Sequence, residues 1–163
     1  MDPSAGTITG LCAITATICR LHGWLRSMFP TRVRFYCSSA RYAPDGVGHL
    51  CGCSTQLLSA DVYARVFAPF DEHVLLMYPG GGTLHLCGLH AQHIPRWHAM
   101  RPLRGVQLND AAADDFPAYY HGLRDDQVIY IAPTDAMPLE EILRVSGGRR
   151  VILQGPLEGR IPL

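Results

Sequence analysis

The chain has 163 residues, 14 acidic and 14 basic side chains, and a formal net charge of zero. A chain of this length forms one domain of ordinary size and can bury a hydrophobic core. Balanced charge without a basic stripe excludes the usual means of binding nucleic acid, so we expect no nucleic-acid partner. Every basic residue is arginine, which excludes both a Schiff-base lysine and a P-loop lysine.

The N-terminal part of the chain predicts a helix over residues 7–29, because apolar residues recur at three- and four-residue steps and Pro30 ends the run. Polar residues interrupt this stretch, so we expect no membrane partner. Residues 1–6 lack the basic region of a signal peptide, so we expect reduced cysteines and a cytoplasmic location. Cys12 and Cys19 lie on the predicted helix, and we expect them to be core residues.

Short strands and helices alternate along the rest of the chain. The predicted strands are residues 32–37, 83–87, 105–109, 127–132 and 150–154, and the predicted helices are 59–77, 89–100, 111–123 and 138–145. Residues 38–55 predict a long loop. The alternation indicates βαβ units and a parallel sheet of about five strands with flanking helices. Because a closed (β/α)8 barrel needs about 250 residues, the chain is either an open α/β sheet or part of a barrel.

One strand ends in a histidine and a cysteine, in the sequence Thr83-Leu-His-Leu-Cys87 between two glycine turns. Because side chains alternate along a strand, His85 and Cys87 share one face while Leu84 and Leu86 take the other. An imidazole and a thiolate side by side are two ligands of the kind that zinc takes. We therefore predict a zinc site that includes His85 and Cys87; the alternative is a strand end with a polar lining.

Two further groups of residues could also bind a metal, and the sequence leaves two roles open for each. The sequence His49-Leu-Cys-Gly-Cys53 repeats the tetrapeptide His-Leu-Cys-Gly. Its Cys-x-Cys pair either supplies a third or fourth thiolate across the top of the sheet or, as we favour, repeats the tetrapeptide by chance. His90 and His93 are three residues apart on a predicted helix. They either form a metal trio with His85 or, as we favour, belong to a solvated helix start.

Polar residues follow the other predicted strands. In parallel α/β folds the active site lies at these carboxyl ends. We therefore predict Asn109, Asp110 and Gln154 as substrate-binding residues and Asp135 as the catalytic general acid or base. The alternative role for Asp110 and Asp135 is helix capping.

The segment from Ser54 to Gly88 resembles the uroporphyrinogen decarboxylase superfamily, which includes the cobalamin-dependent methyltransferases. Three features carry the resemblance in order. A Leu-Ser-x-acid helix start precedes the step Phe67-Ala-Pro-Phe70, a His-x-Cys-Gly strand end follows, and short βα units end in Val151-Ile-Leu-Gln-Gly155. The resemblance extends over residues 40–160.

The resemblance implies that residues 1–163 are a single incomplete domain, equivalent to the C-terminal half of a (β/α)8 TIM barrel. In the methyltransferase branch, His-x-Cys and a later cysteine form a zinc site that activates a thiol. His85 and Cys87 match the first two ligands, and Pro156 stands where the third would fall. The resemblance further implies a corrinoid methyl donor in the intact parent and a small-molecule or corrinoid-protein substrate.

Two other functions stay open. One is decarboxylation of a uroporphyrinogen-type substrate. The resemblance implies that the substrate-binding residues of that branch lie in the N-terminal half of the barrel, which has no equivalent in residues 1–163. The other is a non-catalytic half-barrel remnant, whose exposed sheet edges would favour self-association. We expect the chain alone to be inactive in each case, because half of the active-site loops would be absent.

Overall fold

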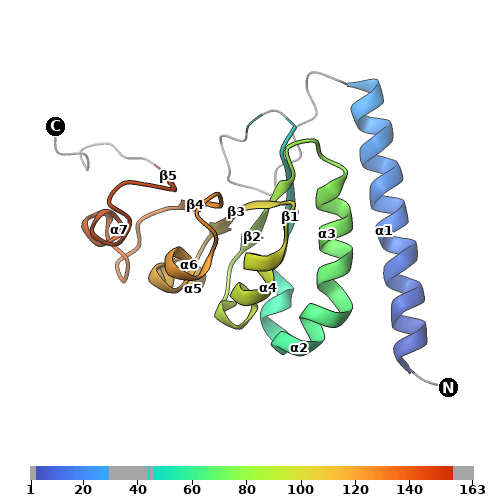
Figure 1. Cartoon of the computed structure of the whole chain (residues 1–163), viewed down its shortest axis with the longest axis horizontal. Coiled ribbons are helices and arrows are strands. Elements are labelled where there is room, and N and C mark those ends of the chain that lie inside the picture. The colour runs from blue at the N-terminus through green and yellow to red at the C-terminus, as the bar shows by residue number, and fades with distance from the viewer. Residues whose placement is uncertain (1–2, 30–43, 45, 156–163) are drawn as a thin grey trace.

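The computed structural model describes residues 3–29, 44 and 46–155 and shows an α/β protein with one five-stranded sheet flanked by helices (Figure 1). The strands are β1 (Gly48–Cys51), β2 (Gly82–Leu86), β3 (Leu103–Leu108), β4 (Val128–Ile131) and β5 (Val151–Leu153). The helices are α1 (Pro3–Met28), α2 (Ala60–Val62), α3 (Ala68–Leu76), α4 (Ile94–Ala99), α5 (Ala111–Asp114), α6 (Phe116–Gly122) and α7 (Leu139–Ser146). Two 3-10 segments, Cys53–Leu57 and Ala91–His93, and a π-helical segment, Tyr63–Phe67, accompany them.

The strands are all parallel and lie side by side in sequence order, from β1 to β5. Each crossover therefore advances across the sheet in the same direction. Right-handed crossovers that advance in one direction place their helices on one face, and Figure 1 shows α3 to α7 along one side of the sheet. The predicted parallel α/β sheet is confirmed, and its strand order is consistent with part of an α/β barrel.

The face of the sheet that the helices cover is apolar. Its strand residues in the hydrophobic core include Leu84, Leu86, Leu103, Val106, Leu108, Ile129 and Ile131. Fully buried aromatic side chains of the helices, including Trp97, Phe116 and Tyr119, belong to the same core. Burial of each such side chain stabilises the fold by about 1.5–3 kcal/mol, so this face supplies most of the hydrophobic stabilisation.

The opposite face, which we term the polar face, carries residues that alternate with the core positions. It includes His49, Cys51, Thr83, His85, Gln107, Tyr130 and Gln154, with Ile152 opposite Tyr130. Cross-strand neighbours on this face are joined by hydrogen bonds. Nδ1 of His49 lies 2.6 Å from Oγ1 of Thr83, and Nδ1 of His85 lies 2.8 Å from Oε1 of Gln107. The predicted division of β2 between His85 on one face and Leu84 and Leu86 on the other is confirmed.

Strand β1 corrects the prediction of a loop over residues 38–55. It pairs with β2 through backbone hydrogen bonds, with Gly48 N donating to Gly81 O at 2.9 Å and Gly52 N donating to His85 O at 2.8 Å. The sequence signal was weak because glycine disfavours strands and only Leu50 packs against the core. Tertiary pairing with β2 therefore decides the conformation of this segment. The predicted strand 32–37 lies outside the described residues.

The helical stretch after β1 changes geometry ahead of Pro69. Ser59 is the N-cap of α2, and its Oγ accepts a hydrogen bond from Val62 N at 3.3 Å. The chain then forms the π-helical segment, in which Ala68 N donates to Tyr63 O. Proline has no N–H to continue the α-helical ladder, so the wider π turn lies next to Pro69 and α3 continues after it.

Helix α1 lies against the outer side of α3 (Figure 1). Nη1 of Arg26 donates to Met77 O at 2.6 Å, and the Tyr78 hydroxyl lies 2.5 Å from Nδ1 of His22. The prediction that Cys12 is a core residue is wrong, because this side chain is exposed on the outer helix.

The N-terminal helix also has the length and apolar composition that a membrane-spanning helix needs, over Gly6–Met28. Signal sequences and core helices share these properties, so the helix by itself decides nothing about a membrane.

Replacement of Gly105 by alanine is expected to destabilise the fold. A Cβ atom at this position would lie 2.2 Å from the backbone oxygen of Val128, so β3 and β4 would have to separate. We predict a loss of about 1–3 kcal/mol in the free energy of unfolding, measured by urea denaturation. Gly10→Ala is the matched control, since Gly10 in α1 has nothing within 4 Å of the added atom. Equal stability of the two variants would contradict the close approach of the strands.

Candidate metal centre

Three possible metal ligands meet at the carboxyl end of β2. Sγ of Cys53, a nitrogen of His85 and Sγ of Cys87 all lie within 4.8 Å of one another. Sγ of Cys53 lies 3.1 Å from Sγ of Cys87, which in turn lies 3.0 Å from Nε2 of His85. The predicted ligands His85 and Cys87 are therefore brought together as expected, and Cys53 joins them from the segment after β1.

The position of Cys53 depends on the turn that follows β1. Thr55 closes this turn, with its Oγ1 donating to Gly52 O at 2.7 Å. Nε2 of His90 lies 3.2 Å from the same carbonyl oxygen, and Nε2 of His93 lies 2.9 Å from Thr55 O. The prediction that His90 and His93 are solvated is wrong, because both are buried. They lie beside the turn that carries Cys53 rather than among the ligand atoms.

The orientation of His85 is set from the neighbouring strand. Its Nδ1 lies 2.8 Å from Oε1 of Gln107, and Nε2 of Gln107 donates to Oε1 of Gln154 at 3.0 Å. With the amide oriented in this way, the His85 proton lies on Nδ1 and donates to Gln107. Nε2 then turns its lone pair toward Cys87, as a metal-binding imidazole requires.

The cysteine sulfurs form a contiguous group. Sγ of Cys51 lies 3.5 Å from Sγ of Cys53, which lies 3.1 Å from Sγ of Cys87. Burial raises the pKa of Cys53, and hydrogen bonds with Cys87 and then Cys51 raise it further. In the absence of a cation Cys53 is therefore a neutral thiol. A divalent cation reverses this preference because it stabilises the thiolate directly.

The donor set fits zinc. Two cysteines and one histidine are ligands that zinc takes, and three protein ligands leave one position of a tetrahedron for water or substrate. Tetrahedral zinc with bonds of about 2.3 Å to sulfur separates two sulfurs by about 3.8 Å. The sulfurs of Cys53 and Cys87 are 3.1 Å apart. To bind one zinc ion, they would need to move apart by about 0.7 Å.

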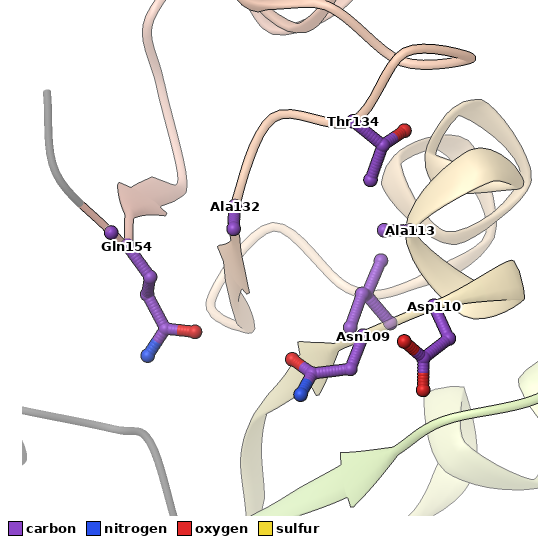
Figure 2. Close-up of a pocket in the computed structure, with 8 residues that line it drawn as sticks. Asn109, Asp110, Ala113, Ala132, Thr134 and Gln154 are labelled. Carbon is purple, nitrogen blue, oxygen red and sulfur yellow. The ribbon is translucent and has the colours of Figure 1, made fainter.

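A pocket of about 370 Å³ lies at the carboxyl ends of β3, β4 and β5, and its lining residue Gln154 is joined to the candidate ligand His85 through Gln107. Asn109, Asp110 and Gln154, the predicted substrate-binding residues, all line it. Figure 2 shows Gln154 on one side of the pocket, with Asn109, Asp110 and Thr134 on the other. Asn109 N donates to Leu86 O at 2.8 Å, so Asn109 is the neighbour of Cys87 across the sheet. A residue that lines the pocket therefore lies next to a candidate ligand.

The two aspartates that were predicted at strand ends lie in different surroundings. Asp110 is at the N-cap position of α5, but its side chain makes no capping hydrogen bond. Its φ of 49° is in the left-handed region, which costs a non-glycine residue about 1–3 kcal/mol. Asp135 lies on an exposed turn and does not line the pocket. The catalytic role of Asp135 stays a prediction.

Comparisons of the chain with protein-family models, with curated proteins and with solved structures give no match. The interpretation of the site therefore depends on its own geometry.

Sequence reasoning offers one residue of the site only as the less favoured alternative, and it does not identify another. Cys53 belongs to the Cys-x-Cys pair for which we favour chance repetition over a third or fourth thiolate, and the structure supports the second alternative for Cys53. The repeated His-Leu-Cys-Gly tetrapeptide is the signal for it. The only sequence signal for Gln107 is its position in the predicted strand 105–109. It lies two residues before Asn109 and therefore on the same face of the strand. Both roles arise from pairing between strands.

A change in pH is expected to reveal the burial of His49. Burial, and then the nearby His85, lower the pKa of His49 to about 4. Between pH 6.5 and 4 the unfolded chain therefore binds a proton at His49 that the folded chain does not bind. We predict that the metal-free protein loses about 2 kcal/mol of stability on this account between pH 8 and pH 5.

A His49→Gln variant is neutral in both states and lacks this loss. Urea unfolding of both proteins at the two pH values measures the difference, and groups common to both proteins cancel. Parallel losses in the two proteins would contradict the lowered pKa.

Removal of the Gln107 carboxamide is expected to weaken zinc binding, because His85 loses the group that fixes its ring. Gln107→Leu should lower zinc affinity about 10–100-fold, measured by competition with a chromophoric chelator. Gln107→Glu keeps an acceptor for Nδ1–H of His85 and should retain most of the affinity. Unchanged affinity in Gln107→Leu would show that Gln107 does not orient the ring.

Proposed function

We propose that the chain binds zinc through Cys53, His85 and Cys87 and presents the remaining coordination position to the thiol of a substrate. The observation that carries this proposal is the convergence of two sulfurs and one imidazole nitrogen, all within 4.8 Å of one another, from two separate segments of the chain. The pairing of β1 with β2 brings these segments together, so the ligand group is a product of the fold.

Each residue of the site has a defined part in this proposal. Zinc in such a site holds a thiol as the thiolate at neutral pH and so makes it nucleophilic. Cys53, Cys87 and Nε2 of His85 hold the metal, and Gln107 fixes the His85 ring. The adjoining pocket, with Asn109 and Gln154, binds the rest of the thiol substrate.

We further propose that the thiol accepts a methyl group, as the resemblance to the cobalamin-dependent methyltransferases implies, with a corrinoid as the donor in the intact parent. Two observations support this proposal. The sheet has the sequential parallel order that a partial (β/α)8 barrel would have, and the ligands lie at the carboxyl ends of its strands. The methyltransferase pattern has a third cysteine at the sequence position that Pro156 occupies here. Cys53 offers a third candidate ligand in its place.

Zinc content is the test of the metal proposal. We expect about one zinc per chain in protein purified without chelator, measured by elemental analysis and native mass spectrometry. Cys53→Ser, Cys87→Ser and His85→Ala should each lose most of this zinc. Cys12→Ser is the matched control, since Cys12 is exposed on α1, and should keep it.

The Cys53→Ser variant gives the sharpest result. Loss of zinc on Cys87→Ser but not on Cys53→Ser would show that a ligand other than Cys53 completes the site. An unaltered zinc content in all three variants would overturn the proposal.

A further inference from the structure

Cys53 and Cys87 are in closer contact than metal binding requires. Their sulfurs are 3.1 Å apart, whereas even the smaller carbon atoms rest about 3.5–4.0 Å apart in ordinary contact. Both side chains are half-buried, and both thiols are free. A disulfide bond of about 2.05 Å would require the sulfurs to approach by roughly a further 1 Å. The two cysteines come from different segments, so the bond would join the turn after β1 to the end of β2.

We propose that Cys53 and Cys87 form an intramolecular disulfide when the metal-free protein meets hydrogen peroxide or a similar two-electron oxidant. The same pair then has two exclusive states, a reduced state that can hold a metal and an oxidised state that cannot. The inference does not depend on the proposed zinc function, because the metal-free chain is what reacts.

Peroxide oxidises the two thiols to a disulfide in two steps. The Cys87 sulfur attacks one oxygen of the peroxide, the O–O bond breaks and Cys87 becomes a sulfenic acid. Nε2 of His85, 3.0 Å from Sγ of Cys87, is placed to take the cysteine proton and pass it to the departing hydroxide, which leaves as water. The Cys53 sulfur then attacks the Cys87 sulfur, and the S–O bond breaks. A second water departs with the Cys53 proton, so two thiols and one peroxide give one disulfide and two waters.

Cys51 is the competing partner, since its sulfur lies 3.5 Å from Sγ of Cys53. The contact between Cys53 and Cys87 is the shorter one. Cys51 is also exposed, whereas Cys53 and Cys87 are half-buried. The geometry therefore favours a disulfide between Cys53 and Cys87 over one between Cys51 and Cys53.

The experiment uses the full chain, reduced and stripped of metal, with stoichiometric hydrogen peroxide and then an alkylating reagent to block remaining thiols. Cleavage after arginine separates the cysteines, because Arg65 lies between Cys53 and Cys87. We expect the peptide that ends at Arg65 to be joined to the peptide that carries Cys87. Fragmentation of the joined peptides then identifies whether Cys51 or Cys53 carries the bond, without any variant.

Two variants provide the matched comparison. Cys51→Ser should keep the joined peptides, and Cys53→Ser should lose them, with the fold of each variant checked by circular dichroism. A bond at Cys51, a bond between two chains, or oxidation of Cys87 without any bond would each overturn the proposal. Because no metal is present, a disulfide without zinc binding would refute only the proposed function, and zinc binding without a disulfide would refute only this inference.

Discussion

The backbone hydrogen bonds between β1 and β2 place the turn after β1 against the end of β2. Gly52 N donates to the carbonyl oxygen of His85 at 2.8 Å, so the residue before Cys53 is joined to the strand that carries His85 and leads into Cys87, the other two candidate ligands. Without this pairing, a cysteine more than thirty residues away in the sequence has no reason to meet Cys87. Metal binding would in turn stabilise the pairing, since ligands from both segments would share one ion.

The sheet divides its two faces between stability and chemistry. Leucine, valine and isoleucine of the strands pack against the helices on one face, while His85, Gln107 and Gln154 form a hydrogen-bonded row on the other. This division follows from sequential parallel order, because crossovers of one hand advancing in one direction cover only one face. The row connects the candidate metal ligands to the pocket, so a change at Gln154 can reach His85 through one intervening side chain.

Much of the fold could be predicted from local pattern, whereas the completed site could not. The alternation in β2 placed His85 and Cys87 on one face because strand geometry fixes that relation within a single segment. The sequence leaves the role of Cys53 open, because β1 has weak strand propensity and gains its structure from β2. The burial of His90 and His93 was missed for a related reason: their polar rings suggested solvent, but carbonyl groups of the turn after β1 offer them partners.

X-ray absorption at the zinc edge of the loaded protein tests the central claim most directly, since it reports the atoms bound to the metal. The account predicts two sulfurs at about 2.3 Å, one imidazole nitrogen at about 2.0–2.1 Å and one further light atom. Addition of a small thiol should replace the light atom with a third sulfur. A first shell of oxygen and nitrogen alone, unchanged by the thiol, would contradict the assignment of Cys53, His85 and Cys87 as the zinc ligands.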